Sequence, residues 1–298
     1  MRSLLRGRPE KVLALAAVMA GLSACAPRQT IVPPLTPTPS NTSQIGQFVW
    51  YDLLTNDLEG SKRFYHELFG WTYDDGGETS PVFTTILHNG RPIGGMADTR
   101  EMQQNVNSSQ WISNLSVPDV DAAVEQALQL GGTVIGGPQD FPHRGRVAVI
   151  RDNQNAVVAL VSSPTGDPPL DRTEVGGWMW TELWTRDAPA SIEFYEGLVG
   201  YEATEFEARN PGEYFMMGRD GLTLAGILAY DLAEVEPNWL PYILVDAPEP
   251  LVARVEELGG RVIFPPDPAI RGGEVAVIAD PSGAAVTIQK WPPEGLDR

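Results

Sequence analysis

Cysteine and histidine are scarce in this chain of 298 residues, which has one cysteine and three histidines. With Cys25 as its only thiol, the chain cannot form an internal disulfide, so its folded part must be stabilised by core packing. His66 is predicted on a helix, His88 before a turn and His143 in a loop. A lone histidine in such a place is typical of a solvated surface, so none of the three predicts a metal site.

Positive charge is scarce as well, because 21 Lys and Arg face 39 Asp and Glu, for a formal net charge of −18. Proteins that bind nucleic acid need clustered Lys and Arg for the phosphates, so this balance argues against nucleic acid as a partner. It argues equally against adsorption to anionic lipid by charge. Solubility is the simplest consequence of so acidic a body.

The apolar run near the N-terminus, residues 12–22, has only about half of the roughly 20 residues needed to span a bilayer. Four cations precede it: Arg2, Arg6, Arg8 and Lys11. This order is typical of a secretory signal, predicted over residues 1–24. The run ends in Leu22-Ser-Ala-Cys25, which resembles the lipobox of bacterial lipoproteins. The resemblance implies cleavage before Cys25 and its acylation, which would anchor the chain to a membrane facing the periplasm or cell exterior. The alternative is a plain signal peptide.

Residues 25–45 are rich in Pro, Thr and Ser and show no apolar period, so we expect an extended tether there. A second proline-rich stretch, 164–175, is expected to link two modules, 46–163 and 176–292, and residues 293–298 form a tail.

A strand-and-helix unit that begins at Trp50 recurs at Trp180, an offset of 130 residues. In each copy a short strand precedes an Asp suited to cap a helix, Asp57 and then Asp187. A glycine ends each predicted helix. Each module then repeats the unit, with Gly131-Gly132 and Gly259-Gly260 closing the later helices. Four strand-helix-strand-strand-strand units with antiparallel pairing predict an α+β fold.

These units resemble the vicinal oxygen chelate superfamily, which includes glyoxalase I, bleomycin-resistance proteins and extradiol dioxygenases. The matching segments are Asp57, Phe64-Tyr65 and Leu68-Phe-Gly-Trp71; Asp187, Phe194-Tyr195 and Leu198-Val-Gly200; Val117-Pro-Asp-Val-Asp-Ala-Ala123; and Asp280-Pro-Ser-Gly-Ala284. The resemblance implies two tandem modules, each of two paired βαβββ units whose curved mixed sheets enclose a cleft. One chain would supply the paired modules, which is consistent with a monomer.

Metal-dependent members of that superfamily hold a divalent ion with His and Glu on the strands of the cleft. The resemblance puts those ligand positions at Trp50, Ile112 and Ala159 in the first module, and at Trp180, Leu240 and Thr287 in the second. None of the six has the family's ligand, and Trp, Ile, Leu and Ala offer no lone pair to a metal. We therefore predict no cofactor and no metal site.

A cleft with aromatic walls and a few polar groups is typical of a small-molecule site. The predicted ligand-binding residues are Trp50, Asp52, Met96, Asn114 and Arg146 in the first module, and Trp180, Glu182, Trp184, Tyr242 and Arg271 in the second. Trp111 and Trp239 are further candidates. Asp52 and Glu182 share a strand face with Trp50 and Trp180, because side chains two apart point the same way. Buried carboxylates need partners or raised pKa values, so both are also candidate general bases.

Three functions remain open. The first, which the missing ligands favour, is a lipid-anchored protein that binds a small apolar or aromatic molecule in one or both clefts. The second is a lyase or isomerase of glyoxalase type, acting on a small carbonyl compound with Glu182 or Asp52 as base. The third is a structural or partner-binding protein of the cell envelope.

Overall fold

The computed structural model describes residues 32–76, 83–101, 109–169, 174–206, 212–230 and 236–291. The signal sequence, Cys25 and the tail lie outside these residues. No helix in the described ranges is long and apolar enough to cross a membrane.

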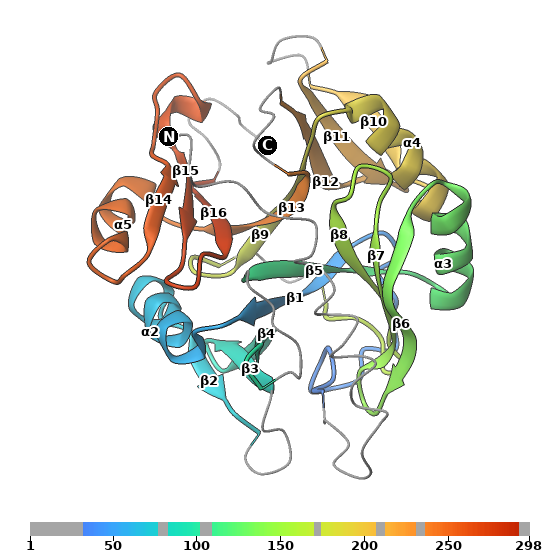
Figure 1. The fold of residues 1–298 in the computed structure, drawn as a ribbon, viewed down its shortest axis with the longest axis horizontal. Coiled ribbons are helices and arrows are strands. Elements are labelled where there is room, and N and C mark those ends of the chain that lie inside the picture. The colour runs from blue at the N-terminus through green and yellow to red at the C-terminus, as the bar shows by residue number, and fades with distance from the viewer. Residues whose placement is uncertain are drawn as a thin grey trace.

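The first module is an eight-stranded sheet with two helices (Figure 1). Its elements are β1 (Phe48–Thr55), α2 (Leu58–Phe69), β2 (Thr72–Asp74), β3 (Phe83–His88), β4 (Arg91–Asp98), β5 (Gln110–Ser116), α3 (Val120–Gln129), β6 (Thr133–Phe141), β7 (Gly145–Arg151) and β8 (Val157–Ser162). The strand order is β2-β3-β4-β1-β5-β8-β7-β6, so the sheet stays open, with β2 and β6 at its edges.

The second module repeats the first. Its elements are β9 (Trp178–Thr185), α4 (Ala188–Val199), β10 (Glu202–Glu205), β11 (Tyr214–Arg219), β12 (Leu222–Ala229), β13 (Asn238–Leu244), α5 (Pro248–Val255), β14 (Arg261–Phe264), the 3-10 turn η3 (Arg271–Gly273), β15 (Val275–Ala279) and β16 (Ala285–Gln289). The order β10-β11-β12-β9-β13-β16-β15-β14 matches that of the first sheet. In both sheets two strand pairs are parallel and the others antiparallel, which confirms the α+β architecture of paired units with mixed sheets.

The predicted helix caps are confirmed. The Asp57 carboxylate accepts a hydrogen bond from the Gly60 amide at 3.1 Å, and Asp187 accepts one from Ala190 at 3.0 Å. Both helices end at a glycine in the left-handed conformation, Gly70 or Gly200, where a side chain would be strained. These local signals fix where each helix starts and stops.

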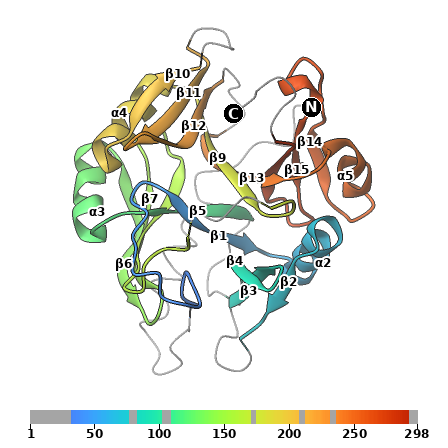
Figure 2. The ribbon, with the colours of Figure 1, turned by 180° about the vertical axis from the view of Figure 1, so that it is seen from behind.

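The two modules interlock through reciprocal contacts. Helix α3 lies beside α4, and α2 beside α5, as the opposite views in Figures 1 and 2 show. The Trp71 indole donates to the Gly176 carbonyl at 2.7 Å, and at the equivalent place Tyr201 donates to the Gly46 carbonyl. Each module therefore completes the core of the other.

The described part of the expected tether lies against the first module. Leu35 is only 1% exposed, and the amides of Ser40 and Asn41 donate to the Thr165 carbonyl at 3.0 and 3.1 Å. The Asp167 amide donates to the Thr42 carbonyl at 2.8 Å. Leu35, an apolar side chain within this polar stretch, is buried in the core of the first module, so residues 32–45 are part of the folded body.

Candidate functional site

Each sheet has an outer face, covered by helices, and an opposite face that we call the inner face. On β1, Tyr51 and Leu53 pack outward with Phe64 and Tyr65 of α2. Trp50 and Leu54 pack on the inner face with Ile112, Val149 and Ala159. Because side chains alternate along a strand, Asp52 lies on the inner face with Trp50, as predicted from the sequence.

Glu182 is the centre of the inner face of the second module. Its carboxylate is fully buried. The Tyr242 hydroxyl donates to its Oε1 at 2.6 Å, and the Trp184 indole donates to the same oxygen at 2.9 Å. Arg271 donates through Nη2 to Oε2 at 2.7 Å and through Nη1 to the Gln289 amide oxygen at 2.5 Å. The four predicted residues of this group thus form one connected cluster.

The Glu182 cluster is assembled from three strands and one turn. Strand pairing places Tyr242 of β13 beside Trp180 of β9 on one side and Thr287 of β16 on the other. Arg271 comes from the turn η3. On β12, a Cβ atom at Gly226 would clash with the Tyr214 hydroxyl, so Tyr214 would have to shift if this residue were not glycine.

The charge of Glu182 is stabilised inside the protein. Burial on its own raises the pKa of this carboxyl, but the Arg271 guanidinium and the hydrogen bonds from Tyr242 and Tyr214 outweigh it, so the pKa lies below its ordinary value. Burial, reinforced by the charge of Glu182, raises the pKa values of both tyrosines. Glu182 is therefore an ionised acceptor with both oxygens engaged, a poor arrangement for a general base.

The first module has a looser version of the same cluster. The Trp50 indole donates to Asp52 Oδ1 at 2.8 Å, and the Asn114 amide donates to Oδ2 at 3.0 Å. The Arg144 guanidinium lies 4.0 Å from Oδ2 and stacks on the Trp50 ring, 4.4 Å from its centre. Burial raises the pKa of Asp52, and Arg144 with the two hydrogen bonds only partly offsets this.

Two residues predicted for the first site lie elsewhere. Met96 is register partner to Leu53, so it faces outward into the core under α2. Arg146 is partly exposed and pairs with Asp121 at 2.5 Å and Asp140 at 3.0 Å, away from Asp52. The candidate Trp111 and its equivalent Trp239 also face outward and donate to the helix tyrosines Tyr65 and Tyr195. Met96, Arg146 and these two tryptophans therefore take no part in the inner-face clusters.

Arg144 is the residue that the sequence prediction missed. The dipeptide Arg-Gly precedes the hairpin strand in both modules, at Arg144-Gly145 and at Arg271-Gly272. Aligning these two dipeptides would have matched Arg144, rather than Arg146, to Arg271. Both arginines reach the inner face from the turn before that strand.

Half-buried aromatic side chains border the Glu182 cluster. The Trp184 ring lies 5.7 Å from that of Phe264 and 6.3 Å from that of Tyr230, measured between centres. Trp180, also half-buried, lines a groove of about 890 Å³ between the modules together with Trp178, Ile93, Leu222 and Leu224. The second module therefore presents aromatic surface around its polar cluster.

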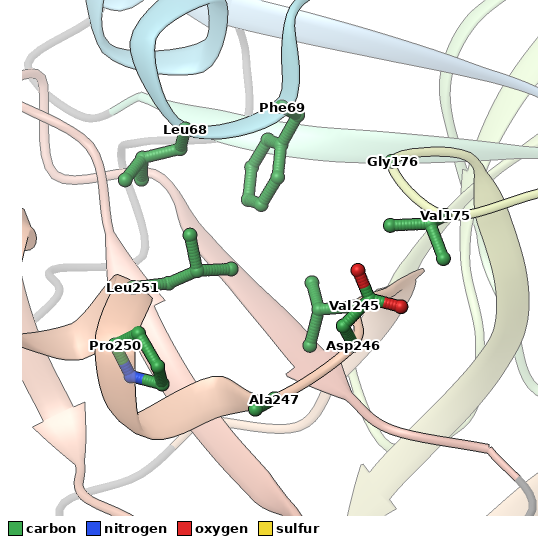
Figure 3. A pocket seen from close by; sticks show the side chains of 9 residues that line it. All are labelled: Leu68, Phe69, Val175, Gly176, Val245, Asp246, Ala247, Pro250 and Leu251. Carbon is green, nitrogen blue, oxygen red and sulfur yellow. The ribbon is translucent and has the colours of Figure 1, made fainter.

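A smaller pocket of about 330 Å³ lies where α2 meets α5 (Figure 3). Leu68 and Phe69 face Pro250 and Leu251 across it, with the Asp246 carboxylate at one side. Its position between two helices separates it from both inner-face clusters.

The family's metal does not fit the donors present. The inner faces hold Trp50, Ile112 and Ala159 in one module, and Trp180, Leu240 and Thr287 in the other, at the positions implied for ligands. Of these six, only Thr287 has a side-chain oxygen, and Glu182 is already bonded to Arg271. Within the described ranges, no group of three or more His, Cys, Asp or Glu side chains is placed to hold a metal ion. The residues at these positions therefore do not match the family's metal ligands.

Comparison with known proteins shows which family this chain belongs to. The family model for the Glyoxalase/Bleomycin resistance protein/Dioxygenase superfamily matches residues 45–160 and 178–288. "Putative glyoxylase CFP32" of Mycobacterium tuberculosis is 29% identical over 249 residues, which cover 82% of this chain and 95% of that protein. "Anthracycline biosynthesis protein DnrV" of Streptomyces peucetius is 31% identical over 133 residues, 40% of this chain and 48% of the relative.

Solved structures agree on the fold. The Mn(II)-bound glyoxalase from Novosphingobium aromaticivorans superposes with a TM-score of 0.56 at 13% identity, covering 83% of each chain. A variant of homoprotocatechuate 2,3-dioxygenase from Brevibacterium fuscum gives a TM-score of 0.57 at 14% identity, over 87% of this chain and 74% of that one.

Proposed function

Since this chain belongs to the Glyoxalase/Bleomycin resistance protein/Dioxygenase superfamily, we propose that it binds a small apolar or aromatic molecule on the inner face of its second module. The sequence further supports an exported lipoprotein anchored through Cys25, because the only cysteine follows a signal-like segment. The protein would then bind its ligand outside the cytoplasm.

The observation that carries the proposal is a polar cluster in which both oxygens of Glu182 are hydrogen-bonded, with aromatic surface beside it. Glu182 has both oxygens bonded, so the cluster is satisfied without a ligand. Trp180, Trp184 and Phe264 are only half-buried. Partly exposed rings around a rigid polar centre favour stacking of a flat or apolar molecule, which recovers the area that these rings still expose to water.

Catalysis of glyoxalase type is the second candidate, favoured by the name of the mycobacterial relative. It requires a carboxylate free to accept a proton. Glu182 does not meet this requirement, since its pKa is lowered and its oxygens are engaged. Asp52, whose pKa is raised by burial, has the better electrostatic setting.

The test is a titration of the purified chain, from residue 26 onward, with planar aromatic and apolar compounds, followed by thermal shift and Trp fluorescence. We expect Trp184→Ala to weaken binding by about tenfold, because it removes a stacking contact that contributes about 1.4 kcal/mol of binding free energy. Leu128→Ala is the control, since Leu128 is an apolar side chain that is 51% exposed and lies on α3 of the first module. Equal loss in both variants would refute the site.

Two further measurements separate the alternatives. Stoichiometric zinc, nickel, iron or manganese in elemental analysis of the purified chain would contradict the metal-free proposal. Formation of a lactoyl thioester from methylglyoxal and added glutathione, abolished by Glu182→Gln or Asp52→Asn, would establish the enzyme instead, because the hemithioacetal that precedes it forms without a catalyst.

A further inference from the structure

Residues 32–36, which we call the arm, lie on the inner face of the first module. Leu35 is 1% exposed and packs with Trp50, Leu54 and Phe141. The Pro33 carbonyl accepts a hydrogen bond from Arg144 Nε at 2.7 Å. One apolar side chain and one carbonyl thus occupy the face that carries Asp52.

The chain that follows the arm is held by hydrogen bonds to the linker. The amides of Ser40 and Asn41 donate to the Thr165 carbonyl, and the Gln44 amide donates to Asp167 Oδ2 at 2.7 Å. The stretch between, residues 37–39, is exposed. The arm can therefore leave the inner face while residues 40–44 stay in place.

Beneath the arm, the Arg144 guanidinium still has a hydrogen-bond donor that is not used. Arg144 is 2% exposed, and its Nη2 is buried without a hydrogen-bond partner in the described part of the chain. In the second module, the equivalent Arg271 donates at 2.7 Å to Glu182, whereas Arg144 remains 4.0 Å from Asp52. An unpaired buried donor costs free energy, so an acceptor that reached Nη2 would bind favourably.

We propose that the arm occupies the first module as a built-in ligand, and that its release exposes a site for neutral carbonyl compounds with a branched apolar group. The Pro33 carbonyl and the Leu35 isobutyl group define this chemistry. A second acceptor on the compound would meet Nη2 of Arg144. A neutral group suits the site better than an anion, because the carboxylate of Asp52 is close by. This proposal concerns the other module and stands apart from the ligand of the Glu182 cluster.

The experiment uses the chain from residue 26 onward, with a protease site inserted between Thr38 and Pro39 and cut only after folding. We expect the cut arm to be displaced by excess synthetic peptide of residues 32–38. A peptide with Leu35→Ser should displace it about 30-fold less well, since it lacks the buried isobutyl group. In the chain, Arg144→Met should release the arm on cutting, and Arg146→Met, two residues along, is the matched control that retains it.

Once the arm is removed, N-acetyl-leucinamide should bind the cut chain but not the uncut chain, and N-acetyl-glycinamide should bind neither. The proposal is overturned if the cut chain keeps its circular dichroism yet rebinds no peptide. It is also overturned if the uncut chain binds peptide or N-acetyl-leucinamide as well as the cut chain does. Should Arg144→Met fail to fold, the Leu35→Ser peptide decides the question without it.

Discussion

Replacing Arg271 by Met is expected to destabilise the chain by about 3 kcal/mol, the lower end of the range for breaking a buried ion pair. The variant leaves the Glu182 carboxylate fully buried without its cation. The lower end applies because Tyr242 and Trp184 still donate to Oε1, and because the Arg271 side chain is 17% exposed and keeps some contact with water. Met preserves much of the apolar stem of the arginine, so the change reports mainly on the charge.

A double-mutant cycle isolates the pair. Glu182→Leu with Arg271→Met removes both charges, so we expect the double variant to lose less than the sum of the single variants by at least about 1.5 kcal/mol. The control is the pair Glu67–Arg254, 3.2 Å apart with both side chains nearly half exposed. Breaking this surface pair should cost no more than about 1 kcal/mol.

The pH dependence gives an independent check. The pKa of Glu182 is lower in the folded chain than its ordinary value of 4.5. A lowered carboxyl pKa stabilises the fold above the unfolded value, and this contribution is lost as pH falls through the folded value. In Arg271→Met, the pKa of Glu182 should rise, so the deficit relative to the parent should be largest near pH 7 and shrink towards pH 4.

The assay is urea unfolding, followed by circular dichroism and Trp fluorescence between pH 4 and 8. A single transition is expected, because hydrogen bonds from Trp71 and Tyr201 cross between the modules. If Arg271→Met loses no more than the Glu67–Arg254 control, or if its deficit does not depend on pH, the account of Glu182 as a buried, arginine-bound carboxylate is refuted.

Three further predictions follow from individual residues. Burial raises the pKa of Asp152 from 3.8 to about 6, so the fold loses stability as pH rises through this range; Asp152→Asn should remove up to about 3 kcal/mol of that dependence in the same unfolding assay. Tyr201→Phe removes the hydroxyl that donates to Gly46 of the other module and should cost about 1 kcal/mol in the same unfolding assay. Cys25→Ser should move the chain from the membrane fraction to the soluble fraction in a bacterial host, and persistence in the membrane would contradict lipidation.

The local signals in the sequence predicted the fold well. Asp57 and Gly70 define one helix by a cap and a stop, and both signals recur at Asp187 and Gly200. The alternation along β1 and β9 placed Asp52 and Glu182 on the inner face beside tryptophans. Each of these inferences depends on residues close together in the chain, where spacing alone determines geometry.

The wrong assignment of Met96 depends on register between strands distant in sequence. Met96 lies opposite Leu53 of β1, and Trp111 lies opposite the same residue on the other side, so both face outward. The inward or outward position of Met96 depends on this register, whereas the alternation along β5 is enough to put Trp111 on the face opposite Ile112 and Asn114. The position of Leu35 was equally hidden, because a polar, proline-rich stretch has no period to predict what it packs against.

The two arginines differ in their distance from the carboxylate, and the two carboxylates differ by one methylene group. Glu182 is long enough to meet Arg271 at 2.7 Å, whereas the shorter Asp52 leaves Arg144 at 4.0 Å. Arg144 therefore keeps donors that its own carboxylate does not use, and the Pro33 carbonyl takes one of them. Asp52→Glu is therefore expected to weaken the contact between the arm and Arg144. A longer carboxylate there would compete with Pro33 for the guanidinium, and the two inner faces would then resemble each other in chemistry as they already do in fold.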